Sequence, residues 1–249
     1  MRRARLPALS SPSDHKPGFL REQSRVLGRQ VSARVVGNPL VARLITRYFH
    51  RLYYGMRART WLDTHWLGTP LLKCPLDLWI YQELLHEIRP HLIVETGTRY
   101  GGSAAYLASL CDLLDHGRVI SIDIDEAEGR PQHPRIRYLH GSSTAPECID
   151  AVKQEVSEGD RVLVILDSDH RRDHVLAELR AYADLVSPGS YLVVEDTNVN
   201  GHPVDPFFGP GPFEAMRDFL AEDARFEVDR AREKFYLTFN PSGYLRRVG

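Results

Sequence analysis

Acidic side chains end two apolar runs that have the composition of buried strands. The run "RVLVILDSD" ends on Asp167 and Asp169, and the run "SYLVVEDTN" carries Glu195 and Asp196 near its end. Because the carboxyl ends of neighbouring parallel strands meet at one edge of a sheet, we expect Asp167, Glu195 and Asp196 to lie close together. An all-oxygen donor set of this kind suits Mg²⁺, with Mn²⁺ or Ca²⁺ as substitutes. The spacing therefore predicts a divalent metal site.

Salt bridges are the alternative explanation of these carboxylates. Arg99, Arg171 and Arg172 lie near them in the sequence and are candidates to neutralise them. Arginine pairing does not explain why carboxylates recur at the same predicted sheet edge, so the metal site is favoured.

A second chemical motif is the glycine-rich turn "ETGTRYGGSA". Gly97, Gly101 and Gly102 allow a tight turn from strand into helix, whose first amides can bind an anionic group. The spacing differs from a dinucleotide fingerprint, because Arg99 and Tyr100 interrupt the close-approach pattern. The turn predicts a cofactor with a negatively charged end that is not a nicotinamide dinucleotide.

Two further residues narrow the choice of cofactor. Asp123, in "SIDID", ends the next strand, where a carboxylate can accept both hydroxyls of a ribose, although a solvated turn acid is the simpler alternative. Ser143, in "HGSS", follows the third strand and can line an adenine edge. With Glu95 available for an amino-acid group, this order suits S-adenosylmethionine.

These residues need a parallel sheet to bring them together. Short apolar runs at 91–97, 118–125, 136–142, 161–169 and 190–198 alternate with segments of helical spacing. This alternation predicts a Rossmann-like, doubly wound α/β sheet. Two closely spaced runs after residue 224, "RFEVDR" and "KFYLTFNPSGYLRRV", predict a C-terminal antiparallel hairpin, as in class I methyltransferases.

Three zones are expected along the chain. Residues 1–37 are predicted to be a mobile segment, residues 38–62 a helical extension, and residues 63–249 the S-adenosylmethionine-binding domain. In the extension, 38–54 carries an apolar stripe at helical spacing with arginines on other faces. We expect this helix to pack on the domain or between subunits of a homo-oligomer, and membrane-surface binding is the alternative.

Composition excludes several classes of function. The chain has 249 residues, 43% of them hydrophobic, and a net charge of −1, which argues against nucleic acid as a main partner. Its three cysteines form no CxxC pair, which fits a reducing cytoplasm, and no apolar stretch is long enough to span a bilayer. We therefore predict a cytoplasmic protein with a small-molecule substrate.

The sequence resembles the cephalosporin hydroxylase family in five segments. They are "HWLGTPLLKCPLDLWIYQELL", "VETGTRYGGSA", "LDSDH", "VVEDTNVNGHPV" and "GPGPFEA". Members of this family have a methyltransferase fold and are similar to macrolide-sugar and rhamnosyl O-methyltransferases that use Mg²⁺. The resemblance implies Mg²⁺ ligands at Asp167, Glu195 and Asp196, with Asp169 as an alternative to Asp167. The residues expected around the cofactor are Glu95, Gly97, Thr98, Tyr100, Gly101, Ser103, Asp123, Ser143 and Asp167.

The expected reaction is methyl transfer to a hydroxyl that the metal ion activates. His170 stands three residues after Asp167, where catechol enzymes have a lysine, and is the preferred general base; Asp169 and His202 are rivals. The aromatic and Gly/Pro-rich loop at 198–213 favours a bulky acceptor, such as an antibiotic nucleus, another natural product or a glycoside sugar. The alternatives are an Fe(II)-dependent hydroxylase and a non-catalytic accessory protein of a biosynthetic pathway.

Overall fold

The computed structural model describes residues 37–55 and 60–249. The chain forms two compact units, residues 1–45 and 46–249. In the first unit the described residues begin helix α2 (Pro39–Gly55), which continues into the second unit. The predicted mobile segment, 1–37, falls almost entirely outside the described residues. No helix among the described residues is long and apolar enough to cross a membrane.

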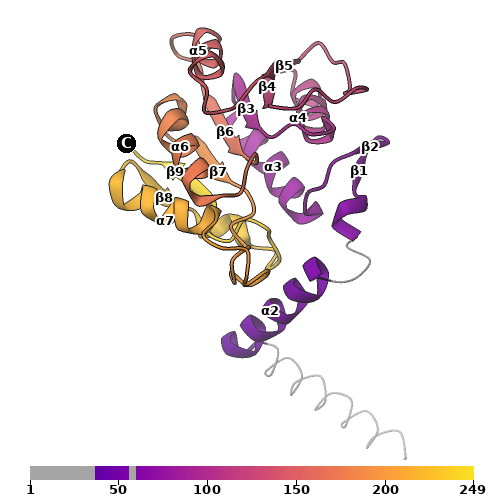
Figure 1. Ribbon diagram of the computed structural model, residues 1–249, viewed down its shortest axis with the longest axis vertical. Helices are drawn as coiled ribbons and strands as arrows, with labels where there is room; N and C mark the ends of the chain where they lie inside the picture. Colours follow the sequence, from indigo (N-terminus) through magenta and orange to yellow (C-terminus); the bar gives the residue numbers. More distant parts are fainter. Residues whose placement is uncertain (1–36, 56–59) are drawn as a thin grey trace, which may run out of the picture. The chain divides into compact units, whose positions relative to one another are not determined.

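The second unit is built on one sheet of seven strands (Figure 1). Its order is β5-β4-β3-β6-β7-β9-β8, in which the first five are mutually parallel and β9 and β8 are antiparallel. The strands are β3 (Leu92–Thr96), β4 (Arg118–Asp123), β5 (Ile136–His140), β6 (Val162–Leu166), β7 (Tyr191–Val194), β8 (Phe226–Val228) and β9 (Tyr244–Arg247). The predicted fold class is thus confirmed.

Helices cover both faces of this sheet, which explains why its central strands are almost unbroken apolar runs. In β3, Leu92 and Val94 join one buried cluster with α5 (Pro146–Gln154), α6 (Arg172–Tyr182) and α7 (Pro212–Glu222). Ile93 joins the other cluster, with α3 (Pro75–Ile88) and α4 (Gly102–Leu113). Alternate residues of each strand therefore anchor opposite layers.

The chain order reverses between β3 and β6, which are neighbours at the centre of the sheet. In open α/β sheets, ligands bind beyond the carboxyl ends of the strands at such a reversal. The glycine-rich turn follows β3, and Asp167 follows β6, so both chemical motifs lie at this place.

The C-terminal strands differ in detail from the predicted hairpin. Residues 234–239, "KFYLTF", form no strand, and β8 and β9 are joined by residues 229–243, which include the short helix η3 (Arg230–Glu233). Leu237 and Phe239 are buried, and they pack with Tyr53, Tyr54 and Trp61 of the N-terminal extension. Their apolar character serves this satellite core rather than the sheet.

The remaining short elements precede α3 or follow α6. They are the 3-10 helices η1 (Thr60–Asp63) and η2 (Ala183–Leu185) and the two-residue strands β1 (His65–Trp66) and β2 (Thr69–Pro70), which pair with each other.

Candidate active site

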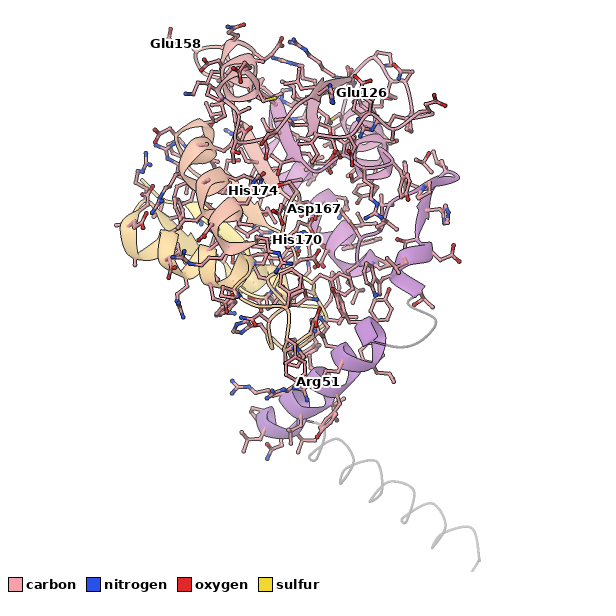
Figure 2. All side chains as sticks on the ribbon, viewed as in Figure 1. Arg51, Glu126, Glu158, Asp167, His170 and His174 are labelled. Carbon is pink, nitrogen blue, oxygen red and sulfur yellow. The ribbon has the colours of Figure 1, made fainter. Side chains whose placement is uncertain are left out.

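Two carboxylates and one imidazole meet at the carboxyl ends of β6 and β7. His170 Nε2 lies 3.2 Å from Asp167 Oδ1 and 3.3 Å from Asp196 Oδ2. One possible ligand atom from each of the three residues lies within 4.8 Å of the other two, which is close enough for all three to bind one metal ion. Figure 2 shows the labelled Asp167 and His170 side by side near the strand ends. Their side chains are 20–28% exposed, so the group is open to a ligand.

The backbone at Asp196 is held in an unusual conformation. Its φ of 52° lies in the left-handed region, which non-glycine residues rarely adopt. The amide of Asp196 donates to Asn240 Oδ1 at 3.0 Å, and this hydrogen bond helps to hold the turn. Strained residues of this kind cluster at functional sites.

Lys73 is the residue of this site that sequence reasoning missed. Its ammonium donates to Asp167 Oδ2 at 2.6 Å and to Glu195 Oε1 at 2.8 Å, and its side chain is only 3% exposed. The Tyr81 hydroxyl also donates to Glu195 Oε1. Glu195, predicted as a metal ligand, is thus turned towards Lys73 and Tyr81, and it does not belong to the three-residue group.

The available signal for Lys73 was a single lysine set among apolar residues, "PLLKCPL". The three arginines proposed as alternative partners of the carboxylates make other contacts: Arg171 with the Phe208 carbonyl, Arg172 with Asp218, and Arg99 with the Tyr100 ring. Charge compensation at the strand ends therefore comes from a lysine that approaches from the segment before α3.

Buried charges at the site shift one another's pKa values. Burial and repulsion from neighbouring carboxylates raise the pKa of Asp196 to about 6, although His170 opposes this. Burial disfavours charge on His170, but Asp196 and Asp167 outweigh it and raise the pKa of His170 to about 9. Burial also disfavours charge on Asp167, but Lys73 and His170 hold its pKa below the ordinary value. The pair of carboxylates thus attracts positive charge.

A cleft of about 810 Å³ opens beside this group. The glycine-rich turn forms one wall, where Gly97 has a φ of 86° and a Cβ would lie 1.8 Å from the Asp167 carbonyl oxygen. Only glycine fits this close approach between the turns that follow β3 and β6. Gly97 therefore allows the glycine-rich turn to pack directly against the backbone of Asp167.

Most of the residues expected around the cofactor line this cleft. They are Gly97, Thr98, Tyr100, Ser103, Asp123, Ser143 and Asp167. Asp123 accepts hydrogen bonds from the backbone amides of Arg99 at 2.6 Å and Asp125 at 2.9 Å. These bonds fix the carboxylate at the mouth of the cleft.

Gly101 and Glu95 lie outside the lining of the cleft. Gly101 is the N-cap of α4 and has a φ of 81°, a conformation that glycine adopts without strain, so its role is to begin the helix. Glu95 is fully buried and accepts from the Ser121 hydroxyl at 2.7 Å. Burial raises the pKa of Glu95 to about 7, with the charge of Lys73 acting in the opposite direction.

The apolar wall of the cleft comes from the N-terminal extension and from the segment between it and α3, and not from the loop at 198–213. Its residues are Tyr54, Trp61, Leu62, Pro70, Leu71 and Leu72. Tyr54 and Trp61 stack with ring centroids 5.1 Å apart. No residue of the 198–213 loop lines the cleft, and Phe207 at its tip is 95% exposed. Sequence reasoning missed this wall because its residues precede the predicted sheet.

The two rival bases differ in position. Asp169 lines the cleft, but it lies outside the three-residue group and accepts from the Arg171 amide at 3.1 Å. His202 does not line the cleft; it pairs with Glu214 Oε1 at 2.9 Å and stacks on Phe213. The structure therefore brings His170, and not His202, to the carboxylates.

Solved structures with the same fold include those of CmcI. The apo structure of CmcI superposes with a TM-score of 0.59 at 24% identity, covering 76% of this chain and 77% of that chain. A CmcI structure described as a complex with Mg and SAM gives a TM-score of 0.56, also at 24% identity, and covers 76% and 78% of the two chains. At this identity the likeness shows the fold.

Sequence comparison gives the family. Residues 58–248 match the family described as "Rhamnosyl O-methyltransferase/CmcI". The rhamnosyl O-methyltransferase of Mycobacterium leprae is 40% identical over 209 residues, which cover 82% of this chain and 90% of that protein. The Mycobacterium tuberculosis H37Rv protein of the same name is 38% identical over 211 residues, covering 82% and 85%. The chain belongs to this family, and its predicted identity as an O-methyltransferase is confirmed.

Proposed function

We propose that the protein methylates a hydroxyl of a deoxysugar such as a rhamnosyl group, using S-adenosylmethionine and Mg²⁺. The observation that carries the proposal is the meeting of Asp167, His170 and Asp196 at a cleft that the adjoining glycine-rich turn also lines. The names of the mycobacterial relatives support the acceptor class. The CmcI complex with Mg and SAM supports the cofactor and the ion.

The donor set fits the proposed ion. Carboxylate oxygens are hard ligands that suit Mg²⁺, and Asp167 Oδ1 and Asp196 Oδ2 face the same point, marked by His170 Nε2. Bound there, Mg²⁺ supplies the positive charge that lowers the pKa of an acceptor hydroxyl. The involvement of Glu195, whose Oε1 is held by Lys73 and Tyr81, remains a prediction.

The cleft also fits the proposed methyl donor. Asp123, fixed by two amides, would accept the ribose hydroxyls, and the first turn of α4 would face the carboxylate of the amino-acid end. S-adenosylmethionine supplies an electrophilic methyl group. The fully buried Glu95 accepts from the Ser121 hydroxyl, which is in turn hydrogen-bonded to the Thr98 hydroxyl in the glycine-rich turn. Glu95 therefore supports this turn.

His170 would take the proton of the acceptor once a bound Mg²⁺ offsets the charges of Asp167 and Asp196, because these charges are what raise the pKa of His170 in the metal-free protein. Its Nε2 lies 3.2 Å from Asp167 Oδ1 and 3.3 Å from Asp196 Oδ2, so it would stand beside an ion that these oxygens hold. Lys73 and Tyr81 keep Glu195 in place, and Lys73 also holds Asp167. These contacts preorganise the proton acceptor and the ion site before the substrate arrives.

The apolar wall matches a deoxysugar. A rhamnosyl group carries a methyl in place of a hydroxymethyl, so one edge of the sugar is apolar while its ring hydroxyls remain polar. Tyr54, Trp61 and Leu62 can cover the apolar edge, while the acidic group faces a hydroxyl. This arrangement would position one hydroxyl for methyl transfer.

An Fe(II) hydroxylase is a weaker candidate on the same evidence. The usual iron site of such enzymes has two histidines and one carboxylate. The group formed by the described residues has one histidine and two carboxylates.

The test is to incubate the purified protein with S-adenosylmethionine, Mg²⁺ and p-nitrophenyl α-L-rhamnoside, and to follow the methylated product by mass spectrometry. The matched control acceptor is p-nitrophenyl α-L-mannoside, which differs only by a hydroxyl on C6. We expect a monomethylated rhamnoside and at least tenfold less product from the mannoside, because the apolar wall would bury that hydroxyl without a partner. Equal methylation of both would refute the deoxysugar assignment.

A further inference from the structure

A buried carboxylate on α6 lies behind the cleft and does not belong to the proposed metal-binding group. Glu178, on α6, is fully buried, and its Oε1 accepts from the Ser143 hydroxyl at 2.5 Å and from the Ser168 hydroxyl at 2.7 Å. His174, one turn earlier on α6, has its Nε2 within 3.5 Å of the same oxygen. A buried carboxylate is costly unless it is hydrogen-bonded, and the contacts to Oε1 meet part of this cost, while Oε2 has no hydrogen-bond partner among the described residues.

All three partners of Glu178 Oε1 line the cleft. They are Ser143, Ser168 and His174, and Glu178 lies behind them. Ser143 follows β5, and Ser168 follows β6; these strands are separated in the sheet by β4 and β3. Glu178 therefore ties together two cleft walls that the sheet does not join directly. Tyr182 reinforces the first wall by donating to the Ser143 carbonyl at 2.7 Å.

The direction of these hydrogen bonds sets the polarity of the cleft. A serine hydroxyl has one proton and two lone pairs. Because both protons are donated to Glu178, the serine oxygens can act only as acceptors towards other groups. His174 Nε2 lies 3.2 Å from Ser143 Oγ and 3.1 Å from Ser168 Oγ, so one imidazole N–H can be shared between them. The hydrogen bond to Glu178 raises the pKa of His174, which favours this donating role.

The position of this network matches the purine of the proposed cofactor. In the proposed binding mode the glycine-rich turn after β3 would take the amino-acid end and Asp123, at the end of β4, would take the ribose. The base would then extend towards the turn after β5, which carries Ser143. Adenine presents a 6-amino donor, whereas a 6-oxo purine presents an acceptor at the same place.

We propose that Glu178 makes the base pocket selective for a 6-amino purine, by holding the Ser143 and Ser168 hydroxyls as acceptors. This inference rests on the proposed use of S-adenosylmethionine. Glu178 does not touch the cofactor; it is a positioning residue that acts through the two serines. A 6-oxo purine would place its oxygen against oxygens that have no proton to donate.

The test compares two product analogues by isothermal titration calorimetry: S-adenosylhomocysteine and S-inosylhomocysteine, which differ in the 6-amino and 6-oxo groups. We expect the wild-type protein to bind the adenosyl compound at least tenfold more tightly. In Glu178→Gln the side-chain amide can donate to one serine, which frees a hydroxyl proton for the 6-oxo group, so the preference should fall at least fivefold. The matched control Glu222→Gln, on α7, removes an exposed carboxylate that pairs with Arg180 and should keep the wild-type preference.

The possible results of the titrations separate the proposed selectivity from the proposed cofactor. Equal affinity of the wild-type protein for the two compounds would overturn the selectivity while leaving the proposed cofactor in place. Failure of both compounds to bind would overturn the proposed cofactor, and the inference with it. A folded Glu178→Gln protein that keeps the full preference would show that Glu178 does not set it. If that variant fails to fold, Ser143→Ala and Ser168→Ala take its place, and retention of the full preference in both would contradict the inference.

Discussion

The carboxylates at the strand ends are balanced by two cationic groups of different accessibility. Lys73 is almost completely buried and holds Asp167 and Glu195. His170 is partly exposed at the cleft and pairs with Asp167 and Asp196. Lys73 is therefore a permanent part of the core, whereas His170 lies where substrate and ion would enter.

We expect Lys73→Met to destabilise the protein by about 3 to 5 kcal/mol, because it leaves buried carboxylates without their partner. The free energy of unfolding from chemical denaturation measures this effect. The control Lys234→Met removes a partly exposed ammonium that pairs with Glu83, and should cost less than about 1 kcal/mol. A Lys73→Met protein as stable as the control would show that the buried ion pair contributes little.

Residue types at the strand ends were predictable from sequence, but their partners were not. Acidic residues after an apolar run identify the ligand-binding edge, because the edge follows from strand order. Lys73 lies 94 positions from Asp167 and 122 from Glu195, so no local pattern connects it to them. The turn of Glu195 away from the metal group depends on this distant contact.

At the scale of elements, α2 meets the core through His50 and not through its apolar stripe. Tyr48, Phe49 and Leu52 are 49–67% exposed, while His50 is 4% exposed and stacks on Phe239 with centroids 5.9 Å apart. The helical spacing predicted the helix correctly. It could not show which face meets the core, because the partner surface is formed by residues near the C-terminus.

His50 should make stability depend on pH. Burial lowers its pKa to about 4 from 6.5, and its Nε2 lies 3.0 Å from Asn198 Nδ2, an arrangement that requires a neutral ring. Since the unfolded chain binds the proton more readily, this contribution is complete above pH 6.5 and is lost as the pH falls towards 4. The shift corresponds to about 3 kcal/mol.

The measurement compares wild type with His50→Gln, which keeps an acceptor for Asn198 but does not titrate. The difference in unfolding free energy between the two proteins should shrink as the pH falls from 6.5 to 4. Glu95 and Asp196 titrate in both proteins, so their effects cancel in the difference. A difference that stays constant over this range would refute the assignment to His50.

At the scale of the whole molecule, the exposed stripe on α2 supports the predicted homo-oligomer. Tyr48, Phe49 and Leu52 lie at helical spacing and each is about half exposed or more, and apolar side chains gathered in this way often mark an interaction surface. We propose that a second copy of the chain covers it. Light scattering after size-exclusion chromatography should show an oligomer for wild type and a monomer for the double variant Tyr48→Ser, Phe49→Ser.

The control for this prediction is Leu113→Ser. This residue ends α4, is 83% exposed and lies far along the chain from the stripe, so its replacement should leave the oligomer intact. A wild-type protein that runs as a monomer at tens of micromolar would contradict the proposed assembly.

The most direct test of the account is the metal dependence of methyl transfer. Formation of S-adenosylhomocysteine should be followed with a rhamnoside acceptor, in metal-free protein and after addition of Mg²⁺, for wild type, Asp196→Asn and the exposed control Asp173→Asn. Asparagine tolerates the positive φ of residue 196, so the fold should persist. We predict that metal removal and Asp196→Asn each slow transfer by about a hundredfold or more, that Mg²⁺ restores the wild-type and control rates, and that cofactor affinity changes little. Undiminished transfer by metal-free wild type would contradict the assignment of the acidic group as a metal site.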